Sequence, residues 1–228
     1  MAPTYNLLVP HAELEPWKLG EAIANSVTHG LGALCSIAGL VALVWIAVLH
    51  GGPRQIVSVT VYGTTLCLLY LCSTLYHAIP VPRARRVLRV LDHASIYLLI
   101  AGSYTPFTLL LLRGTWGWTL FGLVWGIAVI GVVFKAFATG RFGILSGCLY
   151  IAMGWLIVIA VKPLLAVLPL YGFLWLMAGG LFYTGGMAFY AKDRIPYFHM
   201  IWHLFVLAGS ICHYIAIVKY VVPGTIRT

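Results

Sequence analysis

Seven apolar runs of about 20 residues each constrain the fold of this chain more than any other feature. A helix needs about 20 apolar residues to cross the hydrocarbon core of a bilayer, which is about 30 Å thick. The runs cover Ser26–Leu49, Ile56–Ile79, Val90–Leu112, Gly117–Ala138, Gly143–Val161, Leu170–Tyr190 and Phe198–Val222. Short apolar segments of this length cross lipid as helices, because a helix satisfies its own backbone hydrogen bonds. We therefore predict an all-α integral membrane protein built as a seven-transmembrane helix bundle.

Composition and the breaks between the runs support one membrane domain. Hydrophobic residues make up 62% of the 228 residues and charged residues only 8%, whereas a soluble domain carries about a quarter charged residues. The breaks are short and contain Gly or Pro, so no linker separates two domains. We expect a cytoplasmic N-terminal segment (1–25), a transmembrane domain (26–222) and a C-terminal tail (223–228). The first 25 residues lack a short apolar core, so no cleavable signal peptide is expected.

The distribution of basic residues predicts the orientation in the membrane. Nine of the 14 Lys and Arg residues lie on the side of the N-terminus, in that segment and in the breaks after the second, fourth and sixth runs. They are Lys18, Arg83, Arg85, Arg86, Arg89, Lys135, Arg141, Lys192 and Arg194. The other five, on the opposite side, are Arg54, Arg113, Lys162, Lys219 and Arg227. Because cytoplasmic loops carry the excess of Lys and Arg, we expect a cytoplasmic N-terminus and an external C-terminus in a cell membrane.

The same basic residues indicate which partners the chain has. The net charge of +9 does not suggest nucleic acid, because the basic residues lie at the ends of the runs and form no single solvent-facing patch. The arginine cluster Arg83–Arg89 is expected to meet anionic lipid headgroups. The sequence thus indicates membrane lipids as partners, and it identifies no protein partner.

Polar residues converge where four of the predicted helices meet the cytoplasmic face. Glu21, Asn25 and His29 lie at the entrance to the first span, Ser73 and His77 at the end of the second, Asp92 at the start of the third, and His199 and His203 at the start of the seventh. Residues four apart share one face of a helix. Since ionisable groups inside a membrane are costly, this convergence indicates a functional site.

The chemistry of these residues favours a metal. Three neutral imidazoles, from His77, His199 and His203, leave the fourth position of a tetrahedral zinc ion open for water, whose pKa zinc lowers to roughly 7. Asp92 is the only carboxylate inside the predicted spans, and it is the candidate base or hydrogen-bond partner of that water. Ser73, one turn from His77, is a candidate to orient the water or to donate to an oxyanion.

Two of these assignments have structural alternatives. Glu21, Asn25 and His29 either support the metal ligands from behind or only cap and anchor the first helix. Asp92 is alternatively an ion-pair partner of Arg89 or of another arginine in the same break.

The other membrane histidines are expected to be structural. We interpret His50, His93 and His213 as side chains that hydrogen-bond to a neighbouring helix. His213 follows His203 by ten residues, which is too far along the helix to join the polar layer.

The motifs resemble those of the progestin and adipoQ receptor family, in particular its bacterial branch, hemolysin III. The matching segments are Glu21-Ala-Ile-Ala-Asn25-Ser-Val-Thr-His29, Ser73-Thr-Leu-Tyr-His77, Leu91-Asp92 and His199-Met-Ile-Trp-His203, and the resemblance extends over all seven spans. It implies a seven-helix fold with a cytoplasmic N-terminus, in a bacterial plasma membrane, and zinc on the three histidines. It also implies that Ser73 and Asp92 hold a zinc-bound water. The family is similar to the alkaline ceramidases, which implies hydrolysis of a lipid amide.

Three classes of function are compatible with this sequence. The first is a zinc-dependent membrane hydrolase of a lipid amide or ester. The second is a sensor or receptor-like protein in which zinc only joins the second and seventh helices, although the chain lacks the long N-terminal extension of the receptor branch. The third is a cytolysin, which seven ordinary spans without a soluble-to-inserted switch do not favour. An ion transporter is disfavoured because the polar residues form one layer and do not track across the bilayer.

Overall fold

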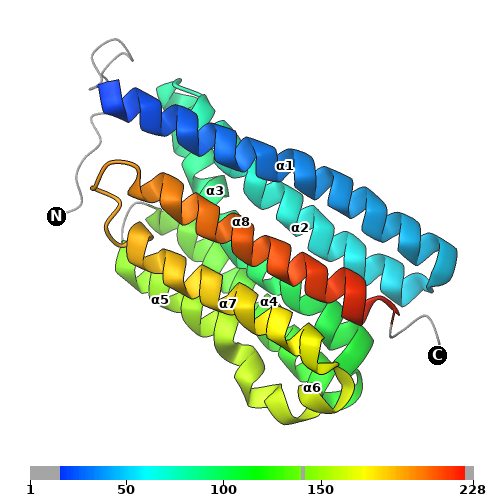
Figure 1. Cartoon of the computed structure of the whole chain (residues 1–228). Coiled ribbons are helices and arrows are strands. Elements are labelled where there is room, and N and C mark those ends of the chain that lie inside the picture. Colours follow the sequence, from blue (N-terminus) through cyan, green and yellow to red (C-terminus); the bar gives the residue numbers. More distant parts are fainter. Residues whose placement is uncertain (1–15, 140–141, 224–228) are drawn as a thin grey trace.

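The computed structural model describes residues 16–139 and 142–223, and every regular element within these ranges is a helix. Seven segments are long and apolar enough to cross a membrane, which confirms the predicted seven-helix bundle. The elements are α1 (Pro16–His50), α2 (Pro53–Ala78), α3 (Pro82–Pro106) with a π-helical end (Phe107–Leu112), α4 (Gly114–Ala138), α5 (Gly143–Gly154), a 3-10 stretch (Trp155–Ala160), α6 (Val161–Val167), α7 (Leu170–Tyr190) and α8 (Phe198–Ala216) with a π-helical end (Ile217–Val221). Helix α1 begins at one end of the bundle and α8 finishes at the other (Figure 1).

Two helices start well before the apolar runs predict, and α2 and α4 start three residues before theirs. Helix α1 begins at Pro16 and α3 at Pro82, eight to ten residues before the expected starts. Proline suits the first helical position, because its fixed φ is helical and its missing N–H would have no partner there. The arginine cluster Arg83–Arg89, expected in a loop, therefore forms the first turns of α3. The boundary at residue 25 falls inside α1. As a boundary of the membrane it stays a prediction. Residues 1–15, Arg141 and residues 224–228, which the predicted terminal segments and the basic-residue count include, lie outside the described part of the chain.

Proline also shapes two later spans. The fifth span was expected to end at Val161, but it continues to Val167 as a helix interrupted by the 3-10 stretch. Pro163 lies in the first turn of α6, where a missing backbone N–H is tolerated. Pro106 is the last α-helical residue of α3, and the chain continues as a π-helix. In both spans a proline lies where one type of helix changes to another, and the chain still crosses the whole span as a helix.

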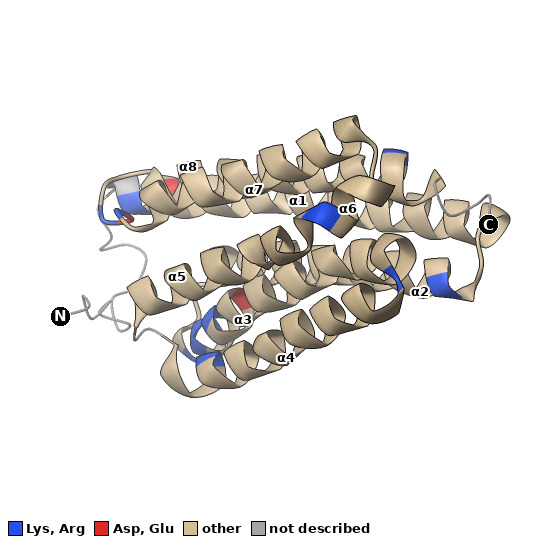
Figure 2. Cartoon of the chain, turned by 90° about the horizontal axis from the view of Figure 1, so that it is seen from below, with Lys and Arg blue, Asp and Glu red and all other residues tan. Residues whose placement is uncertain are grey.

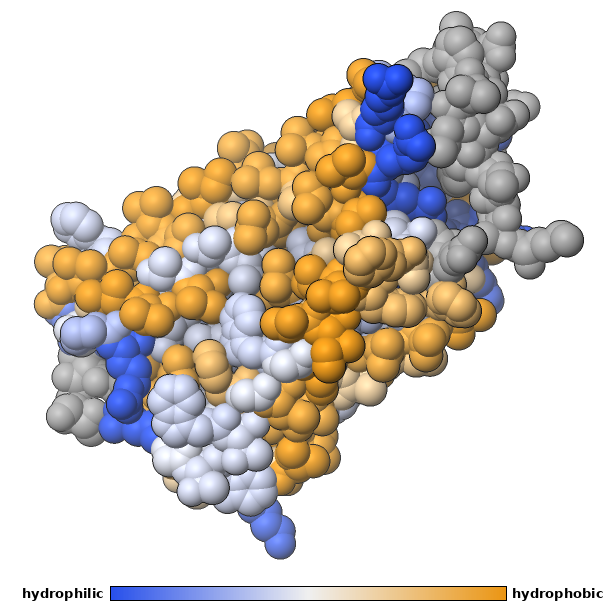
Figure 3. Space-filling model, turned by 180° about the vertical axis from the view of Figure 1, so that it is seen from behind, coloured by the Kyte–Doolittle hydropathy of each residue, from blue (hydrophilic) through white to orange (hydrophobic). Residues whose placement is uncertain are grey.

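The outer surface of the bundle suits a membrane. Large apolar side chains such as Trp45, Ile130 and Ile144 are exposed on its outside. Hydrophobic side chains cover most of the face seen in Figure 3, with hydrophilic residues toward its two ends. Most Lys and Arg residues likewise lie near the ends of the bundle (Figure 2). This arrangement is the one that a lipid environment requires.

Close helix contacts bring α1, α2 and α8 together at one end of the bundle. Helix α1 packs against α2 and α8, and α7 packs against α8. A Cβ atom at Gly32 would lie 2.6 Å from Cδ1 of Tyr70, and one at Gly186 would lie 2.7 Å from Cε3 of Trp202. Any larger residue at these two positions would push α1 away from α2, or α7 away from α8. The glycines therefore hold the polar ends of these helices close to one another.

Candidate metal centre

Three histidines meet at this end of the bundle. His77 lies in the last turn of α2, while His199 and His203 lie one turn apart at the start of α8. Each offers one ligand nitrogen, and these nitrogens all lie within 4.8 Å of one another. Tertiary packing has thus brought together the three residues that the sequence predicted as metal ligands, which we call the histidine cluster.

The donor set of the histidine cluster fits a metal ion. Nε2 of His77 is buried and has no hydrogen-bond partner in the described part of the chain. A tetrahedral zinc ion, with bonds of about 2.0–2.1 Å, holds two ligand nitrogens roughly 3.3 Å apart. The three ligand nitrogens lie within 4.8 Å of one another, so small side-chain rotations are enough to bring them to that distance. Three uncharged imidazoles are donors of the kind that zinc binds.

The first helix fixes the orientation of His203. Its Nδ1 lies 3.3 Å from the backbone carbonyl oxygen of Asn25 and 3.3 Å from Oγ1 of Thr28. A carbonyl oxygen can only accept, so Nδ1 carries the proton in this hydrogen bond and Nε2 is left free to bind a metal. Asn25 therefore acts through its main chain. Sequence reasoning missed Thr28, although it shares one helix face with Glu21 and Asn25 at spacings of four and three.

His29 and Glu21 also contact α8. The ring of His29 stacks on that of His203 with centroids 3.5 Å apart, and it meets the ring of Tyr70 edge-on at 5.0 Å. The carboxyl group of Glu21 lies near the backbone N–H groups of Tyr197 and His199, at the positive end of α8. The predicted supporting residues of α1 thus contact the helix that carries two of the three histidines. Their role in metal binding stays a prediction.

Asp92 and Ser73 approach each other from α3 and α2. Both are buried, both line the same cavity as His199 and His203, and the Ser73 hydroxyl lies near enough to the Asp92 carboxyl to act on it. Oδ2 of Asp92 lies 3.5 Å from Nδ1 of His93, whereas the charge of Arg89 acts on Asp92 from farther away. The basic group in contact with Asp92 is therefore His93, and not Arg89 as the alternative proposed.

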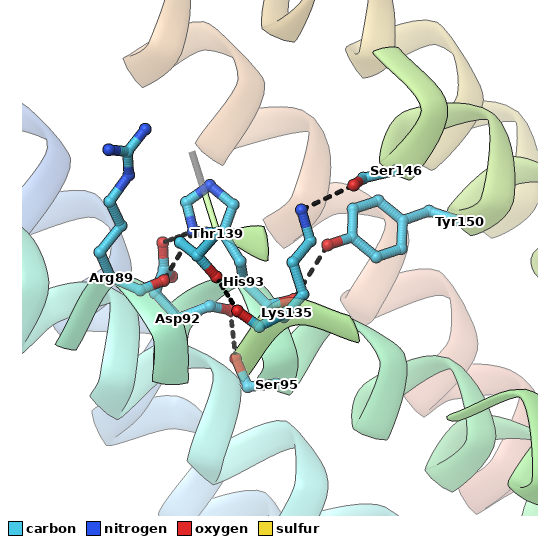
Figure 4. Close-up of polar contacts among 8 residues, drawn as sticks. All are labelled: Arg89, Asp92, His93, Ser95, Lys135, Thr139, Ser146 and Tyr150. Carbon is cyan, nitrogen blue, oxygen red and sulfur yellow. Dashed lines mark hydrogen bonds and ion pairs between the residues drawn. The ribbon is translucent and has the colours of Figure 1, made fainter. Parts of the chain in front are cut away.

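A buried lysine near His93 was not predicted. Lys135 was expected to mark the cytoplasmic end of the fourth span, yet its side chain is only 1% exposed and points into the bundle. Its Nζ donates to Oγ of Ser146 at 2.7 Å and lies 5.9 Å from the ring centre of Tyr150. The hydroxyl of Tyr150 in turn donates to the carbonyl of His93 (Figure 4). The sequence around a lysine at the end of an apolar run does not show whether its side chain points outward or into the bundle. The burial of Lys135 could therefore not be predicted from the sequence.

A cavity extends from the histidine cluster into the bundle. About 1010 Å³ in and around it is free of protein atoms, and part of this space is open to the outside. At one end it is lined by His199, His203 and Asp92, and its middle is lined mainly by apolar side chains of α2, α3, α5, α7 and α8. His213 lies at its other end. The arrangement combines metal-ligating and acid–base groups with space for an apolar chain.

The three histidines that were expected to be structural do not join the cluster. Nε2 of His213 lies 3.3 Å from the carbonyl oxygen of Leu176 on α7, the predicted bond to a neighbouring helix. His93 differs from the prediction, because its Nδ1 bonds to the carbonyl of Arg89 on its own helix at 2.8 Å. His50 is exposed at the end of α1.

Comparisons with known proteins agree with the motifs. A family model described as "Haemolysin-III related" matches residues 18–214. The chain is 48% identical over 203 residues to Hemolysin-3 of Bacillus cereus, covering 89% of this chain and 93% of that protein. It is 48% identical over 202 residues to a Hemolysin-3 homolog of Bacillus subtilis (strain 168), covering 89% and 95%. It is 29% identical over 214 residues to the human monocyte to macrophage differentiation factor, covering 88% and 84%.

Proposed function

The chain belongs to the haemolysin-III-related family, and we propose that it is a zinc-dependent membrane hydrolase of a lipid amide or ester. It is a multi-pass protein of the cell membrane, as its seven spans and its family indicate. One observation carries the proposal. The three imidazoles, with their nitrogens within 4.8 Å of one another, lie beside a largely apolar cavity that also reaches Ser73 and Asp92. Such a combination suits the hydrolysis of a polar bond attached to an apolar chain.

The histidine cluster would hold the zinc ion. A site with three histidines and an open fourth position is typical of catalytic zinc, whereas structural zinc has four protein ligands. Bound zinc would supply a Lewis acid that polarises the carbonyl group of the substrate and makes water a better nucleophile. The contacts of Asn25 and Thr28 with Nδ1 of His203 would hold that ligand in its tautomer and orientation.

The remaining residues would move protons and place the substrate. The carboxylate of Asp92 would accept a proton as water attacks the carbonyl carbon, and would return it to the nitrogen or oxygen that leaves. This transfer balances, because water adds across the bond to give a fatty acid and an amine or alcohol. Ser73 would donate its single O–H to the Asp92 carboxylate and so hold that carboxylate in place. The apolar wall of the cavity would bind the acyl chain and exclude bulk water.

A second candidate is a zinc-stabilised sensor without turnover. It is favoured by the fact that the cluster links two helices, α2 through His77 and α8 through His199 and His203. Zinc at this position would join the helices and stabilise one arrangement of the bundle. The two candidates agree on metal binding and differ only in whether Asp92 handles a proton.

The hydrolase proposal is tested on the purified chain in detergent and in lipid bilayers. We expect about one zinc per chain by elemental analysis. Incubation with a panel of lipid amides and esters should release fatty acid, and removal of zinc with a chelator should stop the release. Zinc at one per chain with no fatty acid released from any member of the panel would leave the sensor as the better account.

A further inference from the structure

His213 occupies the end of the cavity farthest from the histidine cluster. It lines this cavity and also a smaller one beside it, together with Ser103, Tyr104 and Trp155. The proposed reaction does not use it. Ten residues separate His203 from His213 on α8, which corresponds to about 15 Å of helix. A ligand that spans the cavity would therefore meet imidazole groups at both ends.

One nitrogen of His213 lacks a partner. Nε2 lies 3.3 Å from the carbonyl oxygen of Leu176, which can only accept, so Nε2 carries the proton of a neutral ring. Nδ1 is then an acceptor, and it is buried with no hydrogen-bond partner in the described part of the chain. A buried acceptor without a donor is costly, and a donor brought by a ligand would remove this cost.

The other polar groups near His213 are already occupied. Oγ of Ser103 donates to the carbonyl of Ile100 at 2.8 Å, and the hydroxyl of Tyr104 donates to the carbonyl of Gly154 at 2.7 Å. Among the described side chains that line the cavity, buried nitrogen or oxygen atoms without a partner occur only on His29, at the cluster, and on His213. The far end thus offers one free acceptor within a mainly apolar wall.

We propose that His213 determines specificity by accepting a hydrogen bond from a hydroxyl group carried partway along the chain of a bound lipid. This rests on the proposed function, because it takes the head of the lipid to lie at the histidine cluster. A plain hydrocarbon chain leaves Nδ1 unpaired, whereas a hydroxyl at the matching carbon pairs with it. Hydroxylated acyl chains are therefore the preferred class of ligand.

The test measures the binding of fatty acids, the acid products of the proposed hydrolysis, and needs no turnover. Unsubstituted acids and positional isomers with one hydroxyl, all of the same chain length, compete with a fluorescent fatty acid for the purified full chain. We expect one isomer, or two adjacent ones, to bind about twofold to tenfold more tightly than the unsubstituted acid, the effect of one neutral hydrogen bond.

Two variants assign that preference to His213. His213→Phe keeps a ring of similar size and removes the acceptor, so it should abolish the preference and still bind the unsubstituted acid. Ser103→Ala, at the same end of the cavity, removes a hydroxyl that is bonded to its own helix and should keep the preference. Zinc content and thermal unfolding report whether each variant is folded. The comparison of isomers on the wild-type chain tests the inference even if a variant does not fold.

The outcomes separate this inference from the proposed function. Equal binding of all isomers to the wild-type chain, as when a water molecule satisfies Nδ1, would overturn the inference and leave the hydrolase untouched. A preference that persists in His213→Phe would overturn it as well. A preference lost in His213→Phe, in a chain that hydrolyses nothing, would support the inference while the proposed activity fails. No binding of any fatty acid would overturn both.

Discussion

Replacing Asp92 with Asn separates a catalyst from a metal-stabilised bundle. The substitution keeps the shape of the side chain and an oxygen that can accept from Ser73, but it removes the group able to take a proton. Asp92 is not one of the three residues of the histidine cluster, so the metal should stay bound. Because Asp92 is buried and carries the only carboxylate of the cavity wall, its loss should not be compensated by another described side chain there.

The expected loss of rate follows from the proton transfer assigned to Asp92. Removal of a general base costs a factor of about 10² to 10⁴, which corresponds to about 2.7–5.4 kcal/mol of transition-state stabilisation. Ser73→Ala should cost less, since a neutral hydroxyl contributes less than a charged acceptor. The assay follows fatty acid release from lipid amides in detergent or bilayers, with bound zinc measured in the same samples.

A neighbouring serine supplies the matched control. Ser95 is buried on α3 and donates to the backbone carbonyl of Asp92, but it does not line the cavity. Ser95→Ala should therefore leave the rate and the zinc content unchanged. Equal rates of fatty acid release by the wild-type chain and by Asp92→Asn, both with zinc bound, would refute the hydrolase and favour the sensor.

Further expectations concern the metal, its support and the topology. Alanine at any one residue of the histidine cluster should remove zinc, measured by elemental analysis, while His50→Ala should not; full zinc in all three cluster variants would disprove the site. Thr28→Val should weaken zinc binding about tenfold in a chelator competition, because Nδ1 of His203 loses one of its two contacts. Ser26→Ala removes a hydroxyl that is bonded to its own helix, so it should not change zinc binding. A topology reporter fused after Arg227 should be active only outside the cytoplasm and one fused after Arg86 only inside; the opposite pattern would place the cluster at the outer face.

Hydropathy alone predicted the fold, and it also misplaced several helix ends. A membrane requires about 20 apolar residues for each crossing, so seven such runs imply seven helices before any contact is known. The same signal does not show where a helix continues into polar sequence. Helices α1 and α3 therefore begin at Pro16 and Pro82, in stretches that carry charged residues and lie outside the predicted spans.

The histidine cluster could be predicted because two local rules act together. His199 and His203 are four apart and share a helix face, and alternating helix directions bring the end of α2 and the start of α8 to the same side. These rules depend only on spacing and on the number of spans. They predicted which residues gather at this end of the bundle, and the structure brings the three cluster nitrogens within 4.8 Å.

Only the tertiary structure decided which way the other polar side chains point. A lysine at the end of a span normally extends toward water, yet Lys135 turns inward to Ser146, and Nδ1 of His203 meets both Thr28 and the main chain of Asn25. The rotation of each helix about its own axis sets these contacts. That rotation depends on close approaches such as Gly32 against Tyr70, which join residues far apart in the sequence. Spacing along the chain sets which residues share a helix face, whereas the packing of one helix on another sets what that face meets.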